Sequence, residues 1–172
     1  MSRSELSKLL DYCPDTGLFT WLKRNSETKA IKIWNGRFAG QAAGSLDDQG
    51  YVRIVVNTKF YKAHRLAWLL TYGEWPTGEV DHVDGNRSNN AIANLRDATR
   101  QQNQSNRRGS PKNKSGRKGV SWHTQRNAWQ ARIKVNGKGR HLGTFDTPEE
   151  ASEAYAKAAA FHHGAFAFVE QS

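Results

Sequence analysis

The stretch from Glu79 to Asn106 reads EVDHVDGNRSNNAIANLRDATRQQNQSN, and it decides the fold of the region around it. Val80 to His82 has the composition of a short strand, and the turn-forming run Asp84-Gly85-Asn86 follows almost at once. Thr99 and Gln102 have the spacing of a capping box, which predicts a helix to about residue 107. The stretch therefore predicts a strand, an Asn-rich loop and a helix that all carry polar side chains.

These polar side chains have the chemistry of a hydrolytic site. Asp81 and Asn103 offer oxygen atoms, which are the ligands that hard divalent cations prefer. His82 has an imidazole of ordinary pKa ~6.5, which suits it to accept a proton from an attacking water molecule. Because consecutive strand residues point to opposite faces, Asp81 and His82 reach one site only if the strand end twists at the following turn.

Simpler interpretations exist for single parts of the stretch. The Asp84-Gly85-Asn86 run alone is typical of an ordinary surface turn. A calcium-binding EF-hand is excluded, because the acidic residue that ends its loop is missing. The joint occurrence of Asp81, His82, Asn94 and Asn103 favours metal-assisted phosphodiester hydrolysis. His64 stays open between a structural role, a contact to DNA and a chemical role.

The stretch resembles the HNH endonucleases, through the motifs DHVDGN, NN, NLR, AT and the Asn of RQQNQSN. The resemblance implies a ββα-metal fold and a divalent ion, Mg²⁺ or another such as Mn²⁺. By position, Asp81 and Asn103 look like the metal ligands, His82 like the general base and Asn94 like the residue that braces the loop. Asn103 stands where many members have His, and the phage homing-type members share this substitution. YCPDTGLFTW, GYVRI and AHRLAW extend the resemblance toward the N-terminus.

The charge of the chain indicates a polyanionic partner. The chain has 26 Lys and Arg against 16 Asp and Glu, a formal net charge of +10. No acidic residue lies between Asp97 and Asp146, so the basic residues concentrate in one region, as in nucleic-acid-binding proteins. A merely solvated basic surface is the alternative interpretation.

Other features of the sequence limit the classes of protein to which the chain can belong. Cys13 is the single cysteine, which excludes a disulfide framework and a zinc site of the Cys type. No apolar run near ~18 residues and no signal-peptide pattern occurs. We therefore expect a cytoplasmic protein without membrane contact, located in the host cytoplasm if a phage encodes it.

The C-terminal segment predicts a small sheet covered by a helix. Apolar and polar residues alternate from Trp129 to Asn136, and Asn136-Gly137 is typical of a type I′ turn between two strands. Residues 118–123 supply a third strand, and Thr147 begins a helix with Pro148 and a capping-box Glu150. The open face of such a sheet carries Arg132 and Lys134.

Residues 116–168 resemble the AP2 DNA-binding domain, through KGVSW, WQARIK, HLGTFDTPEEASEAYAKAA and HGAFAF. In that family the sheet lies in the major groove of DNA. Ser121 and His123 replace arginines of the plant pattern, and Arg132 stands where an acidic residue is usual, so the target sequence does not carry over. Together the resemblance and the basic run give the following expected DNA-contacting residues: Arg107, Arg108, Lys112, Lys114, Lys118, Ser121, His123, Arg132, Lys134, Arg140 and His141.

The sequence thus predicts an α+β protein with four parts. These are an N-terminal αβ region with a β-hairpin and helix (1–61), the HNH nuclease core (62–107), a basic flexible linker (108–117) and an AP2-like three-stranded antiparallel sheet on one helix (118–172). The expected protein is a monomeric, metal-dependent endonuclease that acts on double-stranded DNA, by nicking or by double-strand cleavage. A non-catalytic AP2-type DNA-binding regulator is the alternative. An RNA-binding protein is a third possibility, which no base-stacking motif supports.

The N-terminal region also allows predictions of single elements. Ser4 caps a short helix, and the turn at residues 14–17 leads into a strand over 18–22. Residues 23–43 are expected to form an irregular loop. A hairpin turning at Asn57-Thr58 and a helix over 63–72 follow.

Overall fold

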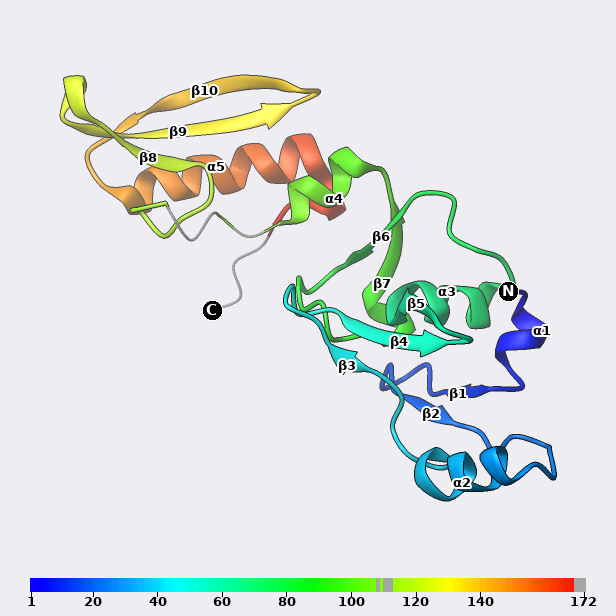
Figure 1. Ribbon diagram of the computed structural model, residues 1–172. Coiled ribbons are helices and arrows are strands. Elements are labelled where there is room, and N and C mark those ends of the chain that lie inside the picture. Colours follow the sequence, from blue (N-terminus) through cyan, green and yellow to red (C-terminus); the bar gives the residue numbers. More distant parts are fainter. Residues whose placement is uncertain (108, 110–112, 169–172) are drawn as a thin grey trace. The chain divides into compact units, whose positions relative to one another are not determined.

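The computed structural model describes residues 1–107, 109 and 113–168, and its packing divides the chain between Ala98 and Thr99 (Figure 1). The first unit is Met1–Ala98 and the second is Thr99–Ser172. This division falls inside the expected nuclease core (62–107), so the helix that carries Asn103 packs with the second unit. The boundaries expected from the sequence stay predictions.

The N-terminal elements follow local capping and turn signals. Helix α1 (Arg3–Leu6) begins at Ser2, whose hydroxyl and backbone exchange hydrogen bonds with Glu5. The prediction of Ser4 as the cap is therefore wrong, because the capping-box partner lies three residues after Ser2. Strands β1 (Leu10–Tyr12) and β2 (Phe19–Trp21) then pair antiparallel, so the predicted turn and strand are confirmed.

Residues 23–43 contain a regular helix, so the prediction of an irregular loop is wrong for this stretch. Helix α2 (Lys29–Phe38) begins at Thr28, whose hydroxyl accepts a hydrogen bond from the backbone N–H of Ile31. No residue of α2 is buried. The broad apolar face that usually indicates a helix in a sequence is therefore weak here. The helix is stabilised instead by its cap and by a few aromatic contacts.

The centre of the first unit is a three-stranded antiparallel sheet and one helix. Strands β3 (Ser45–Leu46), β4 (Val52–Val56) and β5 (Lys59–Lys62) lie in that order. Asn57 and Thr58 both have positive φ, which confirms the predicted turn of the β4–β5 hairpin. Helix α3 (Ala63–Tyr72) ends at Gly73, which adopts a left-handed φ of 87°.

The core of this unit joins these elements and carries the polar ribbon at its edge. Buried side chains come from α1, β1, β2, β4 and α3, with Leu6, Ile54 and Leu66 fully buried. Val80 and Leu95 extend the core into a two-stranded ribbon of β6 (Glu79–His82) and β7 (Leu95–Ala98). The short turn η1 (Ile92–Asn94) lies between the two strands, directly before β7. The strand predicted at Val80 to His82 is confirmed.

The second unit begins with α4 (Arg100–Asn106), which Thr99 caps through the predicted capping box with Gln102. Strands β8 (Val120–His123), β9 (Ala128–Val135) and β10 (Lys138–Phe145) form an antiparallel sheet in the order β10-β9-β8, with the turn η2 (Thr124–Arg126) after β8. Asn136 and Gly137 have positive φ, as predicted for their turn.

Helix α5 (Pro148–His163), followed by the turn η3 (Gly164–Phe166), packs against this sheet. Ala151, Tyr155 and Ala159 are its buried residues, and they contact the inner side of the sheet. The predicted arrangement of three strands and one helix is confirmed. Of the expected linker (108–117), residues 113–117 form a hydrogen-bonded turn around Asn113 and Ser115, and residues 108 and 110–112 lie outside the described residues.

Candidate active site

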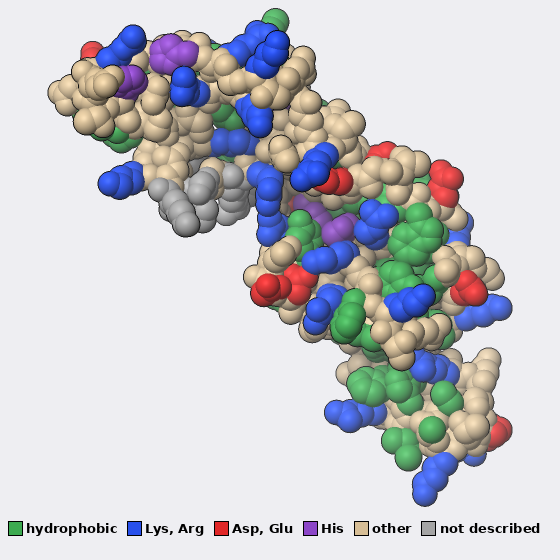
Figure 2. Space-filling view, turned by 45° about the horizontal axis from the view of Figure 1, so that its top comes forward, with side chains coloured by type: hydrophobic (Ala, Val, Ile, Leu, Met, Phe, Trp, Pro, Cys, Tyr) green, Lys and Arg blue, Asp and Glu red, His purple; other side chains and the backbone are tan. Residues whose placement is uncertain are grey.

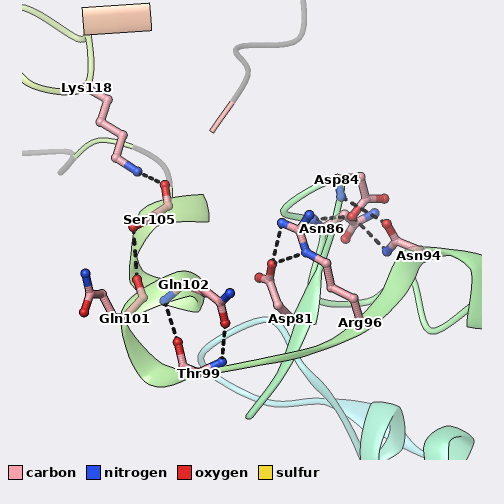
Figure 3. A network of polar contacts seen from close by, with 10 residues as sticks. All are labelled: Asp81, Asp84, Asn86, Asn94, Arg96, Thr99, Gln101, Gln102, Ser105 and Lys118. Carbon is pink, nitrogen blue, oxygen red and sulfur yellow. Dashed lines mark hydrogen bonds and ion pairs between the residues drawn. The ribbon is translucent and has the colours of Figure 1, made fainter. Parts of the chain in front are cut away.

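The ribbon of β6 and β7 buries an ion pair. Asp81 lies opposite Arg96 in the antiparallel register, and its side chain is 4% exposed. The Arg96 guanidinium donates a hydrogen bond from Nε to the Oδ2 atom of Asp81 at 2.8 Å, and its Nη2 atom forms an ion pair with the same oxygen at 2.7 Å (Figure 3). This pairing compensates the desolvated carboxylate and holds its orientation.

Asn94 braces the loop between the two strands. Its Oδ1 atom accepts the backbone N–H of Asp84 at 3.0 Å. Its Nδ2 atom donates to the Asp84 carboxylate at 3.0 Å (Figure 3), and also to the carbonyl of Asn89 at 2.9 Å. One side chain therefore closes the loop from residue 84 to residue 94.

The Asp84 carboxylate organises the first part of this loop. It accepts the side-chain amide of Asn89 and the backbone N–H of Asn86, each at 2.7 Å. Burial alone would raise the pKa of Asp84, but hydrogen bonds from Asn89, the Asn86 backbone and Asn94 hold it below its ordinary value. The loop is thus built around an ionised carboxylate.

His82 is the last residue of β6 and is buried beside Asn90. Its Nε2 atom lies 3.5 Å from the Oδ1 atom of Asn90, which is itself 2% exposed. Asn90 donates from Nδ2 to the carbonyl of Ser88 at 3.0 Å, which turns its amide oxygen toward His82. In the tautomer with a proton on Nε2, His82 donates to this oxygen.

The N-terminal hairpin of β1 and β2 contacts the backbone of the loop at Asn90. The Tyr12 hydroxyl donates to the Asn90 carbonyl at 2.8 Å, and the Ile92 backbone N–H donates to the Pro14 carbonyl at 2.9 Å. Gly17 packs so closely on Asn90 that a Cβ atom there would lie 2.3 Å from its backbone. The β1–β2 turn therefore fixes the loop that holds the His82 partner.

A second imidazole packs against His82. His64, at the start of α3, lies with its ring centroid 5.0 Å from that of His82 in an edge-to-face arrangement. Burial, followed by the neighbouring His82, lowers the pKa of His64 to about 3. Burial also lowers the pKa of His82, against the raising effects of the Asn90 hydrogen bond and the Asp84 charge. Both imidazoles are therefore neutral at pH 7.

The adjacent residues Asp81 and His82 remain on a regular strand. Their cross-strand partners are Arg96 and Leu95, and the turn that joins Gly85 to His82 begins after both residues. The twist that the sequence predicts, to bring both side chains to one site, is therefore not found at Asp81 and His82, because regular pairing continues through His82. Neighbouring positions in such a ladder face opposite sides.

The donor atoms suggested as metal ligands fit a hard cation. Asp81 lies on β6 in the first unit, and Asn103 lies on α4 in the second. Within the described residues, no group of three or more His, Cys, Asp or Glu side chains is placed to hold a metal ion. Two oxygen ligands completed by water and phosphate suit Mg²⁺ or Mn²⁺, whereas Zn²⁺ sites use more nitrogen or sulfur ligands.

The second unit presents five of the predicted DNA-contacting residues on one face of its sheet. In the antiparallel registers, Arg132 pairs with His141, and Ser121 pairs with Gln130. Ala131, Ile133 and Val135 alternate with these residues and are buried against α5. The outer face of the sheet, named the reading face below, therefore carries these residues: Ser121, His123, Arg132, Lys134 and His141.

Two further predicted residues lie elsewhere in this unit. Arg140 pairs with the buried Ile133, so it belongs to the row that faces the α5 side of the sheet. Lys118 donates to the carbonyl of Ser105 at the C-terminal end of α4 (Figure 3), and also to the carbonyl of Arg107 at 2.6 Å. Burial lowers the pKa of Lys118 to about 8.

The remaining predicted residues flank α4. Arg107 ends α4 and is exposed, and Lys114 is exposed in the hydrogen-bonded turn of residues 113–117. Arg108 and Lys112 lie outside the described residues.

Three residues of the site escape prediction from the sequence alone. Asn90 belongs to the quoted NN motif and Arg96 to the NLR motif, yet neither motif shows that Asn90 contacts His82 or that Arg96 binds Asp81. The role of Arg96 follows from the register of β6 and β7, and that of Asn90 from the fold of the loop between them. The contact of His64 with His82 depends on packing between α3 and the ribbon, for which the sequence carries no spacing signal.

Comparison with known proteins agrees with this geometry. A family model described as HNH endonuclease matches residues 61–105. The chain is 36% identical to protein 3.8 of Escherichia phage T7 over 101 residues, which cover 56% of this chain and 84% of that protein. It is also 36% identical over 94 residues to an uncharacterized HNH endonuclease of Acanthamoeba polyphaga mimivirus, covering 54% of this chain and 48% of that protein.

The chain thus spans about half the length of the mimivirus relative. No solved structure matches the chain. Across the described residues, no helix is long and apolar enough to cross a membrane. The HNH match covers α3, the ribbon, the loop closed by Asn94 and most of α4. The chain therefore belongs to the family of phage T7 protein 3.8, and residues 61–105 are its HNH endonuclease domain.

Proposed function

We propose that this protein is a metal-dependent, homing-type DNA endonuclease that hydrolyses phosphodiester bonds. His82 is the general base, Asn94 holds its loop, and Asp81 and Asn103 are the metal ligands. The buried imidazole of His82 carries this proposal, because it lies beside the Asn90 amide oxygen and burial lowers its pKa, which keeps it neutral and able to accept a proton.

In the proposed reaction, the Nδ1 atom of His82 accepts a proton from a water molecule as the water oxygen attacks phosphorus. The bond from phosphorus to the 3′ oxygen breaks, and this oxygen takes a proton from solvent water, which leaves a 5′-phosphate on one fragment and a 3′-hydroxyl on the other. A divalent ion bound by Asp81 and Asn103 would polarise the phosphate and stabilise the departing oxygen. Asn90 fixes the tautomer of His82, and the Tyr12 hydroxyl supports the Asn90 backbone.

The second unit selects the site in this proposal. The resemblance of residues 116–168 to the AP2 domain and the row of basic and polar side chains on the reading face both support a contact with the major groove of double-stranded DNA. Arg107 and Lys114, exposed near α4, would contact phosphates. We propose a monomer with few cleavage sites in a genome, as a homing-type enzyme requires.

Cleavage of a supercoiled plasmid tests this function directly. The full chain, incubated with Mg²⁺ or Mn²⁺, should convert the plasmid to the open circular or linear form, and EDTA should stop the reaction. His82→Ala should lower the cleavage rate by about 10²–10⁴-fold while DNA binding persists. His162→Ala, in α5, is the matched control and should cut at the wild-type rate.

Two outcomes would overturn the proposal. A wild-type cleavage rate in His82→Ala would remove the histidine from the mechanism. Tight DNA binding by the wild type without cleavage under any divalent ion would instead favour the alternative of a non-catalytic DNA-binding regulator.

A further inference from the structure

The segment that contains α2 leaves the core of the first unit and returns to the same residue. The Gly40 backbone N–H donates to the Trp21 carbonyl at 2.8 Å, and the Trp21 backbone N–H donates to the Gln41 carbonyl at 3.0 Å. Figure 1 shows the resulting excursion as the lobe with α2 at the bottom of the view. Since no residue of α2 is buried, core packing does not account for this helix.

A small set of contacts nevertheless fixes the orientation of α2. Trp34 lies edge-to-face on Trp21 with ring centroids 5.5 Å apart, and the Arg24 guanidinium lies 3.7 Å from the Trp34 centroid. Asn35 exchanges two hydrogen bonds of 2.9 Å with the backbone of Arg24. The half-buried residues of α2 are at positions 31, 34, 35 and 38, the spacing of one helix face.

The opposite side of α2 is exposed and basic. Positions 29, 32, 33, 36 and 37 have the spacing of the outer face, and all are exposed. Three of these five residues are the cations Lys29, Lys32 and Arg37. Within the described residues, only Lys32 among these three forms an ion pair, with Glu27 at 2.7 Å. Figure 2 shows Lys and Arg side chains around this lobe, at the bottom of the view.

Gly36 lies in the middle of this outer face. A Cβ atom at this position would meet nothing within 4 Å beyond the backbone of its own helix, so packing does not require a glycine. A glycine inside a helix destabilises it relative to alanine. Glycine does allow a ligand to approach the backbone closely.

We propose that the outer face of α2 docks on the sugar-phosphate backbone of DNA, outside the segments matched by the HNH domain and the AP2 resemblance. Lys29, Lys32 and Arg37 contact phosphates, and Gly36 lets the strand lie close to the helix. The formal charge of +10 on the whole chain agrees with a polyanionic occupant. The inference rests on the proposed function, since that function supplies DNA as the substrate.

The salt dependence of DNA binding tests this face in the full chain. Duplex DNA is titrated in EDTA, which separates binding from cleavage, at several salt concentrations. The triple variant Lys29→Ala, Lys32→Ala and Arg37→Ala should lower the slope of log affinity against log salt by about 0.9 per lost contact, or roughly 2.7 in all. The control triple Lys8→Ala, Lys59→Ala and Lys157→Ala removes the same charge from exposed positions elsewhere and should keep the wild-type slope.

Gly36→Ala provides a second test, because it should change the stability of the protein and its affinity for DNA in opposite directions. It should raise the melting temperature, because alanine favours the helix, and yet weaken DNA binding, because its methyl group separates the helix from the strand. A hydroxyl-radical footprint should lose one protected patch in the triple variant and keep the remainder. Equal salt slopes in the two triple variants would overturn the proposal, as would unchanged binding in Gly36→Ala.

These results separate the inference from the proposed function. If His82→Ala abolishes cleavage while the α2 triple variant binds DNA with the wild-type slope, only the docking face is wrong. If the wild type neither binds nor cuts DNA, the proposed function fails, and the inference fails with it. Binding of α2 to anionic lipid vesicles or to an acidic protein, with unchanged DNA binding, would also overturn the inference.

Discussion

Arg96 binds a single carboxylate oxygen of Asp81 through two nitrogens, at 2.7 and 2.8 Å, inside the ribbon that carries the proposed catalytic base. The Arg96 guanidinium thus neutralises the Asp81 carboxylate, which is also proposed to bind a divalent ion. A buried ion pair contributes little net stability, but a buried carboxylate without its partner is strongly destabilising. The pair therefore stabilises the ribbon when no metal ion is bound.

Removal of Arg96 should make the ribbon depend on divalent ions. In EDTA, we expect Arg96→Met to lower the free energy of unfolding by about 3 kcal/mol, near the lower end of the cost of breaking a buried pair, because the Arg96 side chain is 19% exposed. Mg²⁺ should raise the melting temperature of this variant more than that of the wild type. Arg96→Lys keeps the charge and is the matched control. An equal Mg²⁺ effect in all three proteins would contradict the role of Asp81 as a ligand.

The burial of His64 predicts that acid destabilises the fold. Its pKa is about 3 in the folded protein and ~6.5 when unfolded, so the unfolded state binds more protons between these values. Stability is therefore complete above pH ~6.5 and falls by about 1.4 kcal/mol for each pH unit below it. Urea unfolding of the wild type should lose roughly 2–3 kcal/mol between pH 6.5 and 4.5 from this group.

His64→Gln isolates the contribution of His64, because it removes the titrating ring. The variant should be less sensitive to pH over this interval, whatever its stability at pH 7. His162→Gln removes an imidazole from α5 and should keep the wild-type pH dependence. If His64→Gln loses as much stability on acidification as the wild type, the low pKa of His64 is not the cause.

Asn90 should act on the cleavage rate through the tautomer of His82. Asn90→Leu fills similar volume but removes the amide oxygen that faces Nε2, so the wrong nitrogen can carry the proton. We expect the rate at saturating DNA to fall by about 10²-fold, within the usual range of general-base effects, with DNA affinity unchanged. Asn90→Asp keeps an acceptor oxygen and should restore part of the rate. Equal rates in these two variants would mean that Asn90 serves only the fold.

Local signals in the sequence predicted much of the fold, and tertiary packing determined the rest. Asn136-Gly137 and Asn57-Thr58 marked two hairpins because both residues of each pair adopt positive φ. Helix α2 was missed because Trp34 and its neighbours cover no core and give only a weak apolar face.

In the candidate site, too, local motifs identify some residues, whereas tertiary structure determines their contacts. The motifs located Asp81, His82 and Asn94, but the partners of these residues come from register and packing. Asn90 reaches His82 only because the loop folds back, and Arg96 meets Asp81 only because β6 and β7 pair as they do. Such contacts depend on residues several positions away, and no spacing rule fixes them in advance.

The register of the second sheet separates residues that the sequence grouped together, and this separation gives the last prediction. Arg132 lies on the reading face, whereas Arg140 pairs with the buried Ile133 and belongs to the opposite row. If the reading face enters the major groove, Arg132→Ala should weaken binding to the target duplex by about 1–3 kcal/mol and relax the choice of base at one position. Arg140→Ala removes the same charge from the same sheet and should bind nearly as the wild type. Competition binding with target and scrambled duplexes measures both effects. An equal loss in the two variants would show that charge alone, without a reading face, governs binding by this unit.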